Sequence, residues 1–428
     1  TRYARVTGVQ TCALPISSSN ITQFLVDILV NDRIKLLKEF CVSSEEYNFK
    51  FDPSTTDLPE EIQYQCPILN ASIYYKAHKC FTYLIDSGAK LNGTDSWLCG
   101  PAHIACQCGR LEMLSDAKLS SINFEAKDWK GRSPIHYAAE YDHLDCLRFL
   151  VENKNVNLNI KDKFGMTPYH IACAYGSIDI IEYLIEKGSE WTVDSLNRTP
   201  LEVAVEKGNI EVLRFFASRN ETAIIESETS GRSLAHIAAI NGFDEEVEFL
   251  STIQSFDFNK LDKLGMSPLH YAAEHDQVKV ITTLLKNESV NQNITNPIGK
   301  QALHFAAEYG KVRAIDSLVH TNPKLNNPVD NDGCTPLYLA SANGHLYAVQ
   351  VLIDAGADKE IKTKEGRNPH DVAHGTYAKN IQNAIDGIKQ NCGDLCKPNV
   401  YPVTNEKDET TQKESQLPCI IADRKSVV

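Results

Sequence analysis

The sequence has no apolar run that approaches the ~20 residues of a membrane-spanning helix. Positive charge is also scarce, because 43 Lys and Arg stand against 56 Asp and Glu and leave a net charge of −13. An acidic chain repels phosphate backbones, so we expect neither nucleic-acid binding nor membrane contact from this fragment. Walker-type phosphate loops, dinucleotide-binding glycine patterns and nucleophile elbows do not occur. We therefore expect no enzyme activity and no cofactor.

Cysteine is not scarce, but its distribution argues against disulfides. The chain has 13 cysteines and is far longer than a small secreted domain held by disulfides. Cys106, Cys146 and Cys173 fall at helix positions where a small apolar residue would be buried. We therefore expect reduced thiols in a cytoplasmic protein.

The stretch Asp262–Glu274 (DKLGMSPLHYAAE) has the features of a turn followed by a helix. A polar turn ends at Gly265, and Ser267 can cap the next helix with its hydroxyl. Pro268 suits the first helical position, because no N–H is needed there and its φ is fixed. A small apolar face follows at Leu269 and the two alanines after it.

Versions of this stretch recur along the chain. With His270 as the marker, the copies lie 32 to 34 residues apart, at Asn70, His103, His136, His170, Glu202, His236, His270, His304, Tyr338 and Asp371. A constant period of this length indicates stacked repeats. Each unit cannot bury its apolar face alone, and neighbouring units bury it together.

The repeated phrases match a known pattern. DWKGRSPIHYAAE (128–140), DKFGMTPYHIA (162–172) and DNDGCTPLYLA (330–340) follow D-x-x-G-x-T-P-L-H-x-A-A, and NGHLYAVQVLIDAGAD (343–358) matches the segment after it. The chain thus resembles the ankyrin-repeat family, over about ten repeats. The resemblance implies an all-α solenoid of helix pairs joined by β-hairpin-like turns, curved, with a concave face that binds a protein partner.

The chain divides into four parts. Residues 1–16 (with VTGVQTCALPI) and 423–428 (DRKSVV) resemble translated sequencing-adapter DNA, and we exclude them from the fold. We expect an N-terminal helical cap and loop over 17–65, with two short helices in Ile21–Phe40 on either side of Asn31-Asp32. The repeats fill 66–391. Residues 392–428 are polar and aperiodic, and we expect disorder there.

Two turns depart from the glycine pattern. Leu98 stands where glycine is expected in the second repeat, which predicts an irregular turn. Asn197 replaces glycine in the fifth, and asparagine tolerates the left-handed conformation.

The six motif histidines raise the question of a metal or catalytic site. Metal ligands must converge, whereas these histidines lie on successive layers of the array. We expect each ring to bond the residue that opens its helix. A known zinc spacing is lacking in the group Cys99, His103, Cys106 and Cys108. It is also lacking in His270, Glu274 and His275, and Glu274 recurs in ordinary repeats as Glu140 and Glu308. We therefore expect no metal.

Candidate partner-binding residues lie in repeats two to four. The resemblance implies contacts from the second, third and fifth turn residues and from the inner-helix ends, which here are Trp97, Trp129, Arg132, Tyr141, Phe164, Met166 and Tyr175. Clustered aromatic and Arg side chains are typical of interface hot spots. Later turns carry Ser230 and Asp332 at the third position, so we expect a patch confined to these repeats. The alternative is that each aromatic packs on its own or a neighbouring turn.

These observations favour a monomeric scaffold or adaptor that binds a protein partner on its concave surface. The acidic balance favours a basic partner. One alternative is the regulatory arm of a larger enzyme, such as a kinase or ubiquitin ligase, or of an ion channel whose active domain lies outside this sequence. Another is a purely structural spacer, which would have no favoured surface patch.

Overall fold

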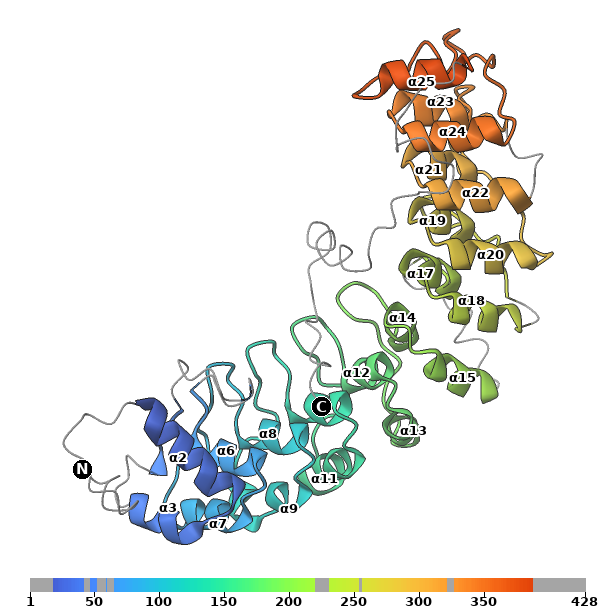
Figure 1. Cartoon of the computed structure of the whole chain (residues 1–428). Helices are drawn as coiled ribbons and strands as arrows, with labels where there is room; N and C mark the ends of the chain where they lie inside the picture. The colour runs from blue at the N-terminus through green and yellow to red at the C-terminus, as the bar shows by residue number, and fades with distance from the viewer. Residues whose placement is uncertain are drawn as a thin grey trace.

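The computed structural model describes residues 18–41, 47–51, 59, 65–219, 231–253, 256–321 and 327–387. The two adapter-like segments, the predicted tail over 392–428 and most of the predicted loop over 47–65 lie outside these residues. The described helices stack side by side in one curved row that runs through α12, α14 and α17 (Figure 1).

Two helices precede the repeats. α2 (Ser18–Val30) and α3 (Ile34–Phe40) meet at a turn where Asp32 has a φ of 46°. The Asp32 carboxylate accepts hydrogen bonds from the N–H groups of Lys79 (3.2 Å) and Cys80 (2.9 Å), at the start of α7. A carboxylate is favourable there because the first N–H groups of a helix lack partners within it. The pair is thereby fixed against the first repeat.

Each repeat contributes an inner and an outer helix. The inner helices are α6 (Ile68–Tyr74), α8 (Pro101–Gln107), α10 (Pro134–Glu140), α12 (Pro168–Tyr175), α14 (Pro200–Glu206), α17 (Leu234–Asn241), α19 (Pro268–Glu274), α21 (Ala302–Glu308) and α23 (Pro336–Ala342). The outer helices are α7 (His78–Asp86), α9 (Leu111–Leu114), α11 (Leu144–Lys154), α13 (Ile178–Glu186), α15 (Ile210–Ser218), α18 (Asp244–Ser251), α20 (Val278–Lys286), α22 (Val312–Thr321) and α24 (Leu346–Asp354). A short η1 (Ala117–Ser121) follows α9, and α25 (Ala378–Ile385) ends the described row. Within the described residues, no helix has the length and apolar character needed to cross a bilayer.

The inner helices start as the sequence predicts. Ser267 accepts a hydrogen bond from the N–H of His270 at 3.4 Å, and Pro268 occupies the first helical position. Ala272 and Ala273 are fully buried and keep the inner helix slim, whereas larger residues such as Leu284 fill the space beside the outer helix. Slim helices beside bulkier ones curve the stack.

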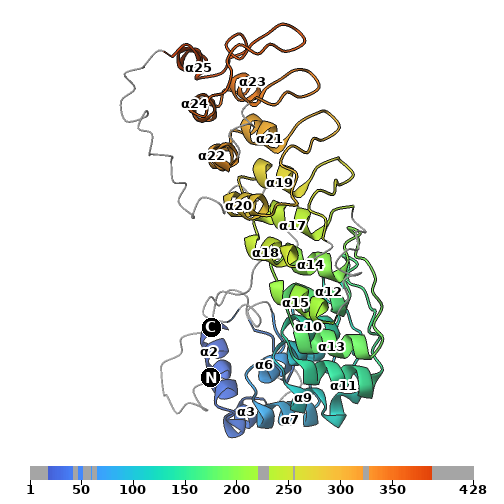
Figure 2. The same cartoon turned by 90° about the vertical axis from the view of Figure 1, so that its right-hand side faces the viewer.

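The turns project together from one side of the inner helices (Figure 2). The carboxylate of Asp262 accepts from the N–H groups of Leu264 and Met266, both at 2.9 Å, while Gly265 takes a φ of 73°. The same arrangement recurs in neighbouring turns, and successive turns are joined through their backbones, for example by the bond from Ser195 N–H to the Phe164 carbonyl (2.9 Å). The tips therefore form a connected row.

The predicted irregularity at Leu98 is wrong. Leu98 itself takes a φ of 64°, and Asp95 accepts from the N–H groups of Trp97 and Cys99 at 2.8 Å, as in the glycine turns. A left-handed conformation costs a side chain such as leucine about 1–2 kcal/mol, which the surrounding bonds offset. Asn197 takes a φ of 61°, as predicted.

Candidate functional site

The motif histidines are structural links. The Nδ1 atom of His270 accepts from the N–H of Ser267 at 2.9 Å, which confirms the predicted bond to the helix-opening residue. Its Nε2 lies 3.1 Å from the Lys300 carbonyl in the next repeat, a second bond that the sequence did not predict. Because Nδ1 accepts a hydrogen bond, the proton of the neutral ring lies on Nε2, which donates to the carbonyl. The same double link is made by His103, His136, His170, His236 and His304.

Burial keeps these rings neutral. Desolvation lowers the pKa to about 4 for His103, His136, His170, His270 and His304. Neither nitrogen of these rings is open to a metal, and Cys99 lies 3.2 Å from the Tyr137 hydroxyl. In the part of the chain that the structure describes, no group of three or more His, Cys, Asp or Glu residues could hold a metal ion.

Two tryptophans meet at the tips of the second and third repeats. The ring centroids of Trp97 and Trp129 lie 5.1 Å apart, and the N–H of Trp129 bonds the Trp97 carbonyl at 3.0 Å. Trp97 is half-buried, while Trp129 remains 43% exposed. The Nζ of Lys130 lies 5.1 Å from the centre of the Trp129 ring. The two rings therefore pack on each other, and Trp129 still presents a surface to solvent.

Arg132 is held within the protein. Its guanidinium lies 3.1 Å from Asp128 and 2.6 Å from Glu140, and it donates to the Tyr137 hydroxyl at 2.9 Å. Only 14% of its side chain is exposed. Arg132 therefore fixes the third turn to its inner helix and offers little free surface.

Met166 does not belong to the predicted patch. Its side chain is 2% exposed. Met166 is the fifth turn residue, where the chain turns back toward the inner helix, so an apolar side chain there packs inward. Phe164, two residues earlier at the tip, stays partly exposed.

Tyr141 and Tyr175 end two neighbouring inner helices. The Tyr175 hydroxyl donates to Glu140 at 3.0 Å, and Gln107 donates to the Tyr141 hydroxyl at 3.3 Å. Both rings are half-buried, so each combines a fixed orientation with an accessible edge. The Tyr175 hydroxyl thereby lies at the end of the preceding inner helix, against the residue directly before Tyr141.

Exposed apolar side chains also lie at turn tips beyond the fourth repeat, and we call these tips together the apolar row. Leu196 is 53% exposed, Leu264 67% and Ile298 54%. Each occupies the third turn position, directly before the residue in the left-handed conformation. An apolar residue at this third turn position can be read from the sequence and would have predicted the exposed tips. Asp332 ends the row in the ninth repeat, and Ser230 lies outside the described residues.

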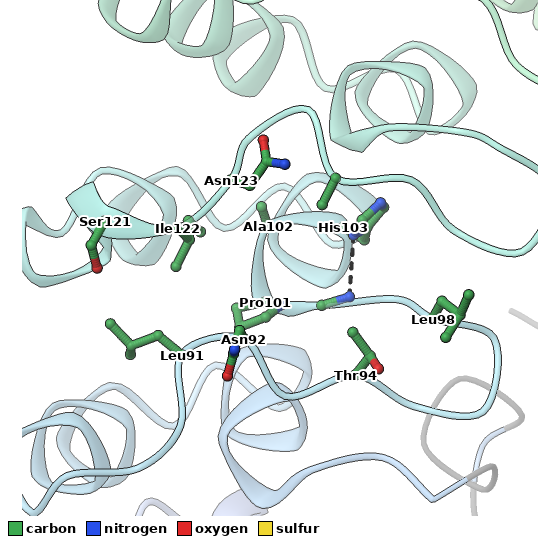
Figure 3. A pocket seen from close by; sticks show the side chains of 12 residues that line it. Leu91, Asn92, Thr94, Leu98, Pro101, Ala102, His103, Ser121, Ile122 and Asn123 are labelled. Atoms are coloured by element: carbon green, nitrogen blue, oxygen red, sulfur yellow. Dashed lines mark hydrogen bonds between the residues drawn. The ribbon is translucent and has the colours of Figure 1, made fainter.

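A shallow hollow lies between the second turn and the segment that follows η1 (Figure 3). It measures about 430 Å³ and is lined by Leu91, Leu98, Ile122 and small polar side chains such as Asn92 and Asn123. No Asp, Glu, Lys or Arg lines it, and His103 is already bonded to the N–H of Gly100 at 3.1 Å. The hollow therefore offers no ionic anchor for a ligand.

The described residues define a stacked helical repeat protein with a row of projecting turns. Family models described as ankyrin repeats match residues 135–185 and 169–217 (many copies) and residues 220–296 and 288–363 (three copies). These matches cover more than half of the chain, and the chain belongs to the ankyrin-repeat family. No curated protein matches it. Ankyrin repeats are protein–protein interaction modules, so this array is one.

Proposed function

We propose that this chain is a non-catalytic cytoplasmic scaffold or adaptor. In this proposal it binds a protein partner through the turn tips and inner-helix ends of repeats two to four, with Trp97, Trp129, Phe164, Tyr141 and Tyr175 in contact. The observation that carries the proposal is the exposed Trp129, whose ring packs against that of Trp97 at a connected row of tips.

The physical support is preorganisation. Asp128 accepts from the N–H groups of Lys130 and Arg132 at 2.8 Å, so the turn that carries Trp129 is already fixed. A rigid indole loses little conformational entropy when a partner covers it, and more of the contact energy remains as affinity. Exposed Leu196 and Leu264 extend the apolar row and give an elongated partner further contacts.

The test is to isolate a partner by cross-linking, purify it and measure its affinity for Trp129→Ala. We expect binding to weaken by roughly 1–3 kcal/mol, because an anchoring aromatic is lost. Tyr347→Ala is the matched control, since Tyr347 is similarly exposed (40%) but lies on outer helix α24. Unchanged affinity for Trp129→Ala, or an equal loss for Tyr347→Ala, would place the interface elsewhere.

A further inference from the structure

Three repeats carry the same ion pair on the concave side. A basic residue at the fifth turn position bonds a glutamate at the end of the inner helix, eight residues later in the chain. The distance is 2.6 Å between Arg132 and Glu140 and 2.6 Å between Lys300 and Glu308, and Arg198 pairs with Glu206. The fold therefore places a cation against this glutamate wherever the chain supplies one.

The seventh repeat keeps the glutamate and lacks the cation. Met266 takes the turn position and is 6% exposed, while Glu274 ends α19. Within the described residues, the half-buried Glu274 carboxylate makes no hydrogen bond or ion pair. The basic residue at the fifth turn position of the preceding repeat is Arg232. It lies 3.7 Å from Asp262 and donates to the Tyr271 hydroxyl at 3.2 Å.

The surroundings of Glu274 disfavour its charge. Burial, and then the neighbouring Glu308, raise the pKa of Glu274, while Lys311 and Arg232 act in the opposite direction. The ionised carboxylate would therefore gain from a further positive charge. Such a charge must come from outside this repeat, because Met266 supplies none.

An exposed aromatic ring stands at the end of the neighbouring inner helix. α19 and α21 pack against each other, and Tyr309, directly after α21, is 50% exposed. Tyr309 follows Glu274 by 35 residues, the spacing at which the Tyr175 hydroxyl donates to Glu140 at 3.0 Å, and burial, followed by Glu274 and Glu308, raises the pKa of Tyr309. A carboxylate beside an open aromatic face is the combination that holds arginine and lysine, through an ion pair and a cation–π contact.

We propose that the ends of α19 and α21 form a docking position for one arginine or lysine side chain of a partner protein. Glu274 takes the charge, and Tyr309 covers the aliphatic stem or the guanidinium plane. The chain shows the chemistry of the occupant three times with its own Arg132, Arg198 and Lys300. This inference rests on the proposed function as a protein-binding array, but it uses different repeats, so the two can fail separately.

The experiment uses the full chain and a peptide array. The peptides have mixed sequence and a fixed central Arg, Lys, Leu or Glu. We expect Arg- and Lys-centred peptides to bind about tenfold more tightly than Leu-centred ones. Glu274→Gln removes the charge at constant size and should reduce this preference to about twofold or less. Glu211→Gln is the control, because Glu211 is an exposed glutamate (72%) on outer helix α15.

Two further variants test the geometry. Tyr309→Ala changes an exposed side chain, so the fold is retained, and the preference for basic residues should fall. Met266→Arg supplies the missing cation from the chain itself, as Arg132 does, and should also remove the preference; circular dichroism checks its folding. The inference is overturned if the unmodified chain shows no basic preference, or if the preference survives Glu274→Gln and Tyr309→Ala. If either result accompanies a loss of partner binding in Trp129→Ala, the proposed function stands without this docking position.

Discussion

At the scale of single residues, the buried histidines are the main polar links between repeats. Each accepts one hydrogen bond within its repeat and donates one to the next, as His136 does to the Met166 carbonyl at 3.2 Å. In the first repeat Asn70 takes the histidine position, and its side-chain N–H donates to the Cys99 carbonyl at 3.2 Å. Only the neutral imidazole can make both bonds, because a protonated ring has no acceptor.

This requirement predicts a loss of stability in mild acid. The pKa of five histidines falls from an ordinary value of about 6.5 in the unfolded chain to about 4 in the folded one. Between these values the unfolded chain binds more protons, so the free energy of unfolding decreases as the pH falls from about 6.5 to 4. We expect on the order of 1–3 kcal/mol per histidine when the pH has fallen through the whole interval. Urea titrations at pH 7.5 and pH 5 measure the part already lost by pH 5.

Some carboxylates act in the opposite direction. Burial raises the pKa of Asp95 to about 6 and also raises the pKa of Asp162, Glu246 and Glu274, which favours the folded state in acid. A variant that removes one histidine therefore isolates the histidine contribution. His270→Asn is the matched variant, because Asn70 shows that an amide fits this position without titrating. It should weaken the pH dependence by about one histidine's share. Stability that is constant or rises between pH 7.5 and pH 5 would contradict the assignment.

At the scale of the turn, glycine serves both backbone conformation and close approach. A Cβ on Gly265 would lie 2.6 Å from Cγ of Pro297 in the next turn, whereas a Cβ on Gly366 would meet nothing within 4 Å. Both glycines have similar φ angles, 73° and 79°. The two positions therefore separate conformational strain from steric contact between repeats.

We expect Gly265→Ala to cost about 1–3 kcal/mol more than Gly366→Ala, because only the first adds a clash to the left-handed strain. Chemical denaturation of the two variants beside the unmodified chain gives the difference directly. If the two substitutions cost the same, the turns do not touch at Pro297 as described.

The repeats were predictable because every copy carries similar residues at the positions that start and pack the inner helix. Pro168, Pro268 and the alanines after them predict inner helices from sequence alone. The features that sequence reasoning missed depend on a neighbouring repeat or on a backbone choice. Leu98 keeps a glycine conformation because Asp95 holds the turn. Met166 packs inward at the turn position where Arg132 forms ion pairs instead. Pattern matching places a residue in its repeat and does not say which neighbour it meets.

At the scale of the whole molecule, the fifth repeat departs from the histidine pattern. Glu202 takes the histidine position, is fully buried, and accepts from the N–H of Thr199 at 2.6 Å, as the imidazoles accept from the residues that open the other inner helices. This repeat lies where the row curves from α14 to α17 (Figure 1).

Glu202→His gives the fifth repeat the same imidazole as its neighbours and should add the neutral-ring link that they make. We expect the variant to unfold at higher urea concentration, by about 1 kcal/mol or more, and with a single sharper transition in place of two overlapping ones, as stronger coupling between neighbouring repeats predicts. Glu202→Gln separates the removal of charge from the new bond. A Glu202→His variant that unfolds like Glu202→Gln, or earlier than the unmodified chain, would show that this position does not limit the coupling.

The histidine links also have a direction along the chain. Each imidazole bonds a carbonyl 28 to 30 residues downstream, as His170 does with Arg198 and His304 with Cys334. The ribosome synthesises the histidine before the carbonyl that it bonds. During translation, the imidazole Nε2 of a newly made repeat therefore lacks its carbonyl partner until the following turn has left the exit tunnel. Native structure should consequently trail synthesis by one repeat along the growing chain.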